Sequence, residues 1–206
     1  MCFSATASLI AGGALSAVGV ATIKKAKKKR ELPLAAIPLL FGVQQLIDGA
    51  VWLSFGQPLH TFAVYGYALF AFVFWPLYIP FVLISIETNR VRREVLEALA
   101  LVGFGVAAFL LYYIVSGNVF AEIVNHCVAY DAPHPYRIPL LAFYLIATAG
   151  PFLLSTKRIL NAFGVVLLVS FAIAGWFYVA TFSSTWCFFS ALLSGILYWH
   201  VAGGSK

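Results

Sequence analysis

Seven long apolar stretches, separated by short polar gaps, make up most of this chain. The stretches cover residues 3–23, 32–55, 61–86, 95–115, 138–155, 159–180 and 186–202. Each is close to the about 20 apolar residues that a helix needs to cross a hydrocarbon core of roughly 30 Å. The pattern predicts an all-α fold, a bundle of seven transmembrane helices that forms a single integral membrane domain over residues 1–206.

Composition points the same way. The 206 residues are 63% hydrophobic and only 10% charged, which excludes an ordinary water-soluble fold. The first cationic cluster follows the first apolar stretch instead of preceding it, so a cleavable signal peptide is not expected and that stretch should remain as a helix.

The positive charges predict the orientation. Twelve of the 13 Lys and Arg residues fall in every second gap between stretches, and only Arg137 lies in an opposite gap. By the positive-inside rule the N-terminus is then outside and the C-terminus cytoplasmic. These cations sit beside helix ends, where they set topology and attract anionic membrane lipids, so the basic character does not indicate a nucleic-acid partner.

The second stretch carries the strongest candidate site. Gln44, Gln45, Asp48 and Trp52 are spaced by three, four and eight positions, which places them on one helical face. An ionised carboxylate at that depth costs about 2.5–3.5 kcal/mol, so Asp48 should face the bundle interior or a water-filled pocket. Two interpretations stay open: a binding or catalytic carboxylate flanked by amides, and a hydrogen-bonded clasp between helices.

The predicted topology brings the soft metal ligands to the outer face, where the longest connection, 116–137, also lies. Cys2 and Cys187 open the first and seventh helices, so one interpretation is a disulfide between them. A second is a transition-metal site, with zinc as an example, that draws on Asp48, His126 and Cys127 and on the other two thiols. A third is that the thiols are buried and inert.

Small residues predict how the helices pack. Ser4, Ser8, Gly12 and Ser16 recur every four residues along the first stretch, and Cys187, Ser190 and Ser194 form a similar face on the seventh. Small side chains let helix backbones approach closely in lipid. We therefore expect the first and seventh helices to touch and close the bundle.

Three blocks of the chain resemble a family of small prokaryotic multi-span membrane proteins of unknown function. The blocks are Met1-Cys2-Phe3-Ser4-Ala5, then Pro38, Phe41-Gly42 and Gln44-Gln45-x-x-Asp48-Gly49-x-x-Trp52, and last Ser184-x-Trp186-Cys187-Phe188-Phe189-x-Ala191. The resemblance implies residence in the prokaryotic plasma membrane and implies no activity. It draws attention to Cys2, Gln44, Gln45, Asp48, Trp52 and Cys187.

Three functions are compatible with these patterns. The first, which we favour, is binding of a small ligand, lipid or ion in an outward-facing polar pocket lined by Gln44, Gln45, Asp48, Trp52 and His126. The second is a metal-dependent membrane hydrolase that uses Asp48 and His126. The third is a structural or accessory subunit that packs against a membrane-protein partner or against other copies of itself.

Overall fold

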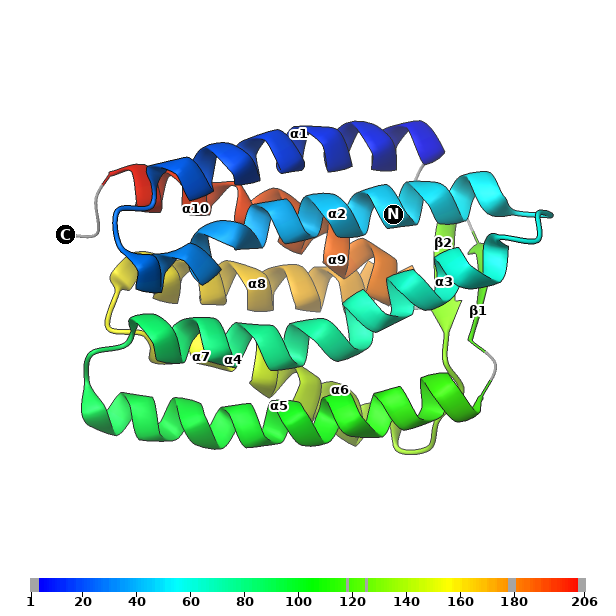
Figure 1. Ribbon diagram of the computed structural model, residues 1–206. Helices are drawn as coiled ribbons and strands as arrows, with labels where there is room; N and C mark the ends of the chain where they lie inside the picture. Colours follow the sequence, from blue (N-terminus) through cyan, green and yellow to red (C-terminus); the bar gives the residue numbers. More distant parts are fainter. Residues whose placement is uncertain (1–3, 118, 125, 178–180, 204–206) are drawn as a thin grey trace.

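The structure is a computed structural model that describes residues 4–117, 119–124, 126–177 and 181–203. Its elements, in chain order, are α1 (Ala5–Lys25), a 3-10 turn (Lys29–Glu31), α2 (Leu32–Ser54), α3 (His60–Ala68), a π-helical segment (Leu69–Phe74), α4 (Trp75–Ile86), α5 (Arg90–Ser116), β1 (Phe120–Val124), β2 (Cys127–Asp131), α6 (Arg137–Thr148), α7 (Gly150–Leu154), α8 (Arg158–Phe177), α9 (Phe182–Ser194) and α10 (Ile196–Ala202). Nearly all the helices run roughly along one axis, and the strands close one end of the bundle (Figure 1).

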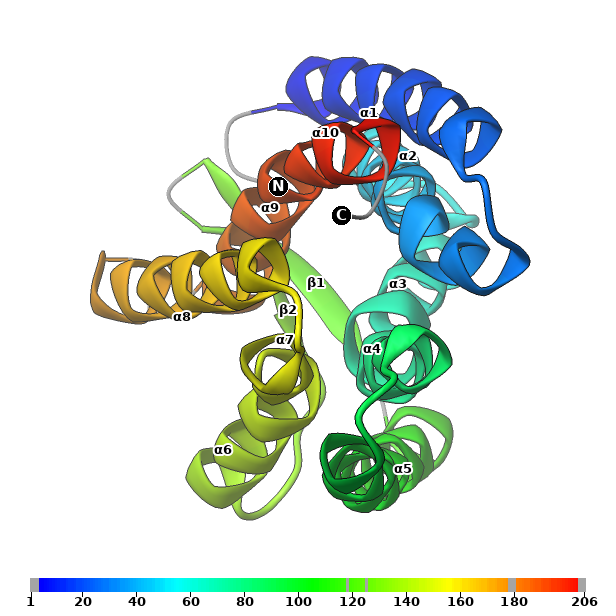
Figure 2. The same cartoon turned by 90° about the vertical axis from the view of Figure 1, so that its left-hand side faces the viewer.

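Six helical segments in the described part of the chain are long and apolar enough to cross a membrane. They are Ala5–Lys25, Lys29–Ser54, His60–Ile86, Arg90–Ser116, Arg158–Phe177 and Phe182–Ala202. Seen from one end, the helices surround a common core, and α1 lies outside the ring against α2 (Figure 2). The structure thus supports a helical membrane protein.

The predicted span at 138–155 is not one continuous helix. It is divided into α6, with 12 residues, and α7, with five, and the break falls just before Pro151. Proline has no backbone N–H, so Pro151 cannot donate the helical hydrogen bond to the carbonyl four residues earlier in α6. At 1.5 Å per residue, α6 alone covers about 18 Å, less than the hydrocarbon core. A seventh span is therefore not established.

The connection between α5 and α6 folds into a hairpin that the apolar pattern did not predict. Strands β1 and β2 are antiparallel, with Phe120 opposite Asp131 and Val124 opposite Cys127. His126, with φ of 59°, occupies the left-handed region at the turn. The first four residues of β2 are buried against the bundle.

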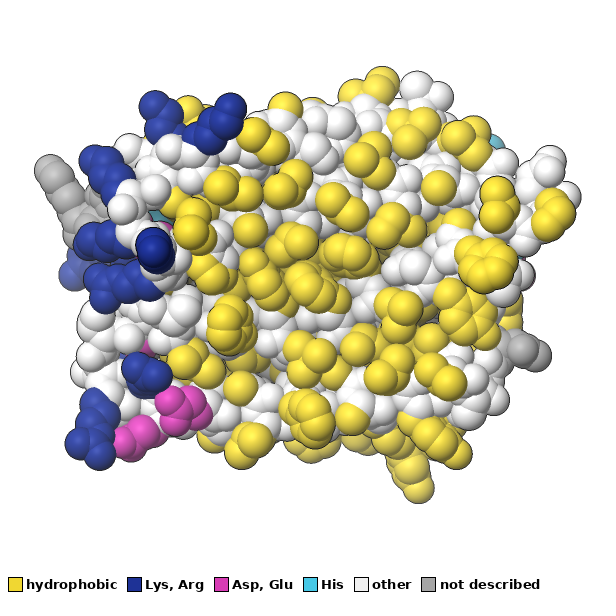
Figure 3. Space-filling model, in the orientation of Figure 1, with side chains coloured by type: hydrophobic (Ala, Val, Ile, Leu, Met, Phe, Trp, Pro, Cys, Tyr) yellow, Lys and Arg dark blue, Asp and Glu magenta, His cyan; other side chains and the backbone are white. Residues whose placement is uncertain are grey.

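The cations gather at the end of the bundle opposite this hairpin. They surround the α1–α2 and α4–α5 junctions, while apolar side chains cover the middle of the visible face (Figure 3). The predicted clustering of Lys and Arg at one end is thus present.

Helix α1 packs chiefly along α2, and it also touches α10. The predicted contact between the first and seventh helices therefore exists, but it is secondary. Glycines carry the main contact: a Cβ atom built on Gly19 would lie 2.3 Å from the backbone nitrogen of Leu39, and one on Gly42 would lie 2.5 Å from the hydroxyl of Ser16. The two backbones approach too closely for larger side chains at these positions.

Glu87 joins two connections at the cationic end. One carboxylate oxygen accepts hydrogen bonds from the backbone N–H groups of Thr88 and Asn89, and the other accepts from the N–H of Thr156, each at 2.9 Å. Arg92 adds a second link by donating to the carbonyls of Leu154 and Ser155. Burial favours a higher pKa for Glu87, but the three backbone donors outweigh it and hold the pKa below its ordinary value.

The α1–α2 contact predicts a strong difference between two glycines on α1. Gly19→Ala should lower the free energy of unfolding by about 1–3 kcal/mol, because the added methyl group meets rigid backbone. Gly13→Ala is the matched control, since a Cβ atom there meets nothing within 4 Å. Thermal unfolding of both variants in detergent measures the difference, and equal melting temperatures would contradict the packing.

The geometry of Glu87 predicts a stability loss in acid. Glu87→Gln should reduce stability at neutral pH by about 1.5–3 kcal/mol, because it weakens hydrogen bonds to a charged acceptor. Since the folded-state pKa is lowered, the contribution is fully present above the ordinary pKa and disappears as the pH falls through the folded-state value. The free energy of unfolding of Glu87→Gln should therefore fall less steeply in acid than that of the unmodified protein. Glu94→Gln, which removes the acid of an exposed pair with Arg90, should show the same pH dependence as the unmodified protein.

Candidate functional site

Asp48 on α2 is completely buried and connects three elements. One of its oxygens accepts a hydrogen bond from the Ser8 hydroxyl of α1 at 2.8 Å, and the other accepts from the Tyr130 hydroxyl of β2 at 2.6 Å. A buried carboxylate requires such donors, because an unpaired charge in the interior is costly. Asp48 therefore fastens both the outer helix and the hairpin to α2.

Tyr130 is held in place by a second contact. Its ring stacks on that of Tyr67 in α3, with centroids 3.8 Å apart and planes 12° from parallel. Burial raises the pKa of the Tyr130 hydroxyl well above its ordinary value, and the charge and hydrogen bond of Asp48 raise it further. The hydroxyl therefore stays protonated and donates to Asp48.

One helical turn before Asp48, Gln44 begins the rest of the polar network. Its side-chain oxygen accepts a hydrogen bond from the Trp75 indole N–H at 2.6 Å, and Trp75 in turn stacks on Phe41. The Cys187 thiol of α9 lies beside Gln44 and Tyr67. Polar groups from α2, α3, α4 and α9 thus meet inside the bundle.

Two atoms of this interior region, the amide oxygen of Gln45 and the hydroxyl of Ser184, have no hydrogen-bond partner among the described residues. The amide nitrogen of Gln44 and the hydroxyl of Tyr67 have only the Cys187 thiol, a weak hydrogen-bonding group, beside them. An unsatisfied buried donor or acceptor costs about 1–3 kcal/mol, so such atoms point to a further polar partner such as water or a bound molecule.

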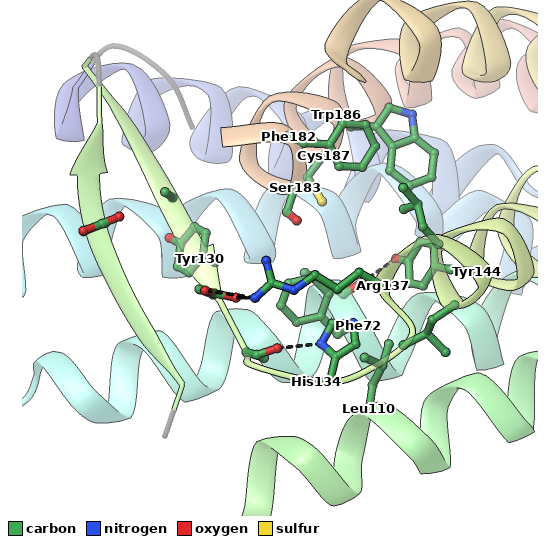
Figure 4. Close-up of a pocket in the computed structure, with 17 residues that line it drawn as sticks. Phe72, Leu110, Tyr130, His134, Arg137, Tyr144, Phe182, Ser183, Trp186 and Cys187 are labelled. Carbon is green, nitrogen blue, oxygen red and sulfur yellow. Dashed lines mark hydrogen bonds and ion pairs between the residues drawn. The ribbon is translucent and has the colours of Figure 1, made fainter. Parts of the chain in front are cut away.

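A cavity of about 440 Å³ adjoins this network (Figure 4). Tyr130 and Cys187 belong to both, because they line the cavity as well as flanking the buried polar groups. The remaining wall is largely aromatic and aliphatic and comes from the π-helical segment, α5, α6 and α9; its principal members are Phe72, Leu110, Leu140, Tyr144, Phe182 and Trp186. Tyr144 also donates a hydrogen bond to the carbonyl of Ala71.

The charged side chains of the cavity lie toward the hairpin. Arg137, at the start of α6, pairs with Asp131 of β2 at 3.1 Å, and both side chains are substantially exposed. His134 contacts the carbonyl of Ala132 through Nδ1 at 2.5 Å, and Glu122 completes the rim. An exposed ion pair of this kind contributes little stability, so Arg137 can exchange Asp131 for another anion at small cost.

The predicted site residues divide into two groups. Gln44, Gln45 and Asp48 share one buried face of α2, so the expectation that Asp48 faces the interior is met. Trp52, farther along α2, is half-buried. His126 lies exposed at the hairpin turn. None of these five residues is among those that line the cavity.

The metal interpretation finds no support in the described residues, and the predicted Cys2–Cys187 disulfide is wrong. No three His, Cys, Asp or Glu side chains there are close enough together to hold a metal ion, so Asp48, His126 and Cys127 do not form the predicted site. Asp48 is directed inward, whereas His126 is directed to solvent at the turn. Cys187 has a free, buried thiol, whereas Cys127 at the start of β2 is disulfide-bonded. Cys2, the predicted partner of Cys187, lies outside the described residues.

Sequence reasoning missed the partners that complete the network. Ser8 was assigned to a packing seam, whereas its hydroxyl also bonds Asp48, and Tyr130 was one of many polar residues in a long connection. Tyr67 and Trp75 lie in an apolar stretch. The sequence there does not distinguish an aromatic residue that belongs to the polar network from one that only packs in the core. Only the buried acid itself signalled that hydroxyl donors had to exist nearby.

The Asp48 contacts predict that the Tyr130 hydroxyl stabilises the fold. Tyr130→Phe should lower the free energy of unfolding by about 1–3 kcal/mol, because the buried carboxylate loses a donor while the ring stacking remains. Tyr112→Phe is the control, since Tyr112 is 65% exposed on α5. Chemical or thermal unfolding in detergent compares the two, and an unaffected Tyr130→Phe variant would show that the hydrogen bond contributes nothing.

Comparison with known proteins identifies a family but no activity. No curated protein matches this chain, and no solved structure matches it. One family model, described as a family of unknown function (DUF6629), matches residues 1–205. Because that match covers almost the whole sequence, the chain belongs to the DUF6629 family.

Proposed function

We propose that this protein binds a small amphipathic molecule, such as a single-chain lipid, in the cavity between the hairpin, α5, α6 and α9. The observation that carries the proposal is the division of the cavity wall into an apolar part and a charged rim. Such a wall matches a molecule with an apolar body and a polar head. A volume of about 440 Å³ is also within the range of cavities that hold small ligands.

The interior network supports binding. Cys187 lines the cavity and also contacts Gln44 and Tyr67, whose buried amide nitrogen and hydroxyl have only this thiol, a weak hydrogen-bonding group, beside them. A polar atom of the ligand, or a water that accompanies it, would give those buried groups a partner. This retains the outward-facing binding site inferred from the sequence but moves it from the face of Asp48 to the neighbouring cavity.

The charge distribution supports an orientation for the site. The cations cluster at the end opposite the hairpin (Figure 3), and the positive-inside rule places such an end in the cytoplasm. The N-terminus and the cavity then belong to the outer side of a prokaryotic plasma membrane. A ligand would therefore enter from outside the cell or from the outer leaflet.

Arg137 provides the sharpest test of binding. With oleate as the probe, native mass spectrometry of the detergent-purified protein should detect one saturable adduct. Arg137→Gln should weaken that adduct about tenfold, because the carboxylate loses a charge-assisted partner. Asp131→Asn should strengthen it by freeing Arg137 from its ion pair.

Arg93→Gln is the matched control. Arg93 also forms an exposed pair with an acid, Glu97 at 3.1 Å, but it lies at the opposite end of the bundle. Its oleate adduct should equal that of the unmodified protein. Absence of any saturable oleate adduct, or an equal loss of adduct in Arg137→Gln and Arg93→Gln, would reject the proposed site. The alternative role as an accessory subunit would then be tested by co-purification of a membrane-protein partner.

A further inference from the structure

A second hollow lies at the cationic end of the bundle and is independent of the cavity described above. Its volume is about 710 Å³, and it is bounded by the α1–α2 connection, the α7–α8 connection and the end of α10. Figure 2 looks onto this end of the bundle, and Ile86 and Thr88 at the α4–α5 connection line the hollow as well. We call this hollow the basic groove.

Four cationic side chains line the basic groove: Lys28, Arg30, Lys157 and Arg158. None of the four forms an ion pair with an acid in the part of the chain that the structure describes. Two other cations at this end, Arg90 and Arg93, do have acidic partners one helical turn away. Exposed lysines of the α1–α2 connection outside the groove also have no acidic partner among the described residues, but only the groove brings such cations together from two connections of the chain.

Lys157 shows the effect of this crowding. Burial lowers its pKa, Lys28 and Arg30 lower it further, and the negative charges of Glu31 and Glu87 oppose the shift without cancelling it. Glu31 is buried and is not among the groove-lining residues. Glu87, the other nearby acid, is already occupied by three backbone N–H donors. An anion in the groove would therefore relieve repulsion that the protein's own acids leave in place.

The groove also has the position and donors of a head-group site. Thr88 and Thr156 line it together with the cations, and α8 begins there at Arg158, so the positive end of a 20-residue helix faces the same region. Trp199 on α10 lines its edge and is 70% exposed, as is common for tryptophan at a membrane–water boundary. Basic pockets between helices at such a boundary suit phosphate head groups.

We propose that the basic groove binds a phosphate group, carried by the head group of an anionic phospholipid or by a soluble phosphate compound. The α1–α2 connection supplies Lys28 and Arg30 from one side, and the α7–α8 connection supplies Lys157 and Arg158 from the other. A bound phosphate would link two connections that are distant in the sequence.

The test compares two double variants with equal loss of charge at the same end. In nanodiscs of mixed phosphatidylcholine and phosphatidylglycerol, native mass spectrometry counts the phosphatidylglycerol retained by the protein. Lys157→Gln/Arg158→Gln should weaken retention roughly 10- to 30-fold, because the phosphate loses two cationic hydrogen-bond donors that contact it directly in the groove. Lys25→Gln/Lys27→Gln, which removes two exposed cations outside the groove, should change it less than about twofold.

A second arm identifies the source of the phosphate. Inorganic phosphate is titrated against the lipid-free protein in neutral detergent while the melting temperature is recorded. A soluble compound is supported if phosphate raises the melting temperature, Lys157→Gln/Arg158→Gln abolishes that rise, and no phosphatidylglycerol is retained. A lipid is supported if phosphatidylglycerol is retained and phosphate does not raise the melting temperature. Lys28→Gln/Arg30→Gln repeats both arms from the opposite wall if the first variant fails to fold. Equal losses in the groove and control variants, or no response in either arm, would overturn the proposal.

Discussion

The structure depends on one buried anion and the hydroxyl groups that surround it. Asp48 accepts from Ser8 and Tyr130, and through these two bonds α1, α2 and β2 hold fixed positions relative to one another. In a membrane there is little hydrophobic force between helices, so specific polar contacts and close backbone packing decide which helices associate. The glycine contacts between α1 and α2 provide the packing, and Asp48 provides the polar specificity.

The same contact explains why the hairpin end differs from the cationic end. Tyr130 anchors β2 over the bundle, and the cavity wall begins at this residue. At the other end, Glu87 and Arg92 tie connections together through backbone groups and leave a groove with cationic walls. One end therefore presents an apolar cavity with a charged rim, and the other presents mainly positive charge. The two proposed ligands follow from this difference.

Local signals in the sequence predicted much of the architecture. Apolar length predicted the six long helical segments, and the alternating gaps predicted the cluster of cations at one end. The face that carries Gln44, Gln45 and Asp48 was predicted to lie inside, because a charge in lipid is expensive, and all three residues are buried. Each of these features depends on composition or on helical periodicity, which a single sequence records directly.

The features that were missed depend on contacts between distant residues. Tyr130 reaches Asp48 across 82 positions, and only closure of the hairpin over the bundle brings them together. Pro151 within the apolar run at 138–155 indicated a kink, but hydropathy could not show that the run divides into α6 and α7. The predicted Cys2–Cys187 pair assumed that two helix ends at the same level must meet, whereas α1 lies chiefly against α2.

The π-helical segment Leu69–Phe74 has a consequence for the register of the chain. Residues eight positions apart on a regular α-helix point about 80° away from one another, yet Tyr67 and Trp75 both face the polar interior. A π turn absorbs one additional residue, which rotates the following helix by about 100° and largely cancels that offset. The segment thus holds one residue more than the register needs: deletion of a single position within Leu69–Phe74 would restore a regular α-helix in which Tyr67 and the tryptophan, then seven positions apart, differ by only about 20° and still face the same interior.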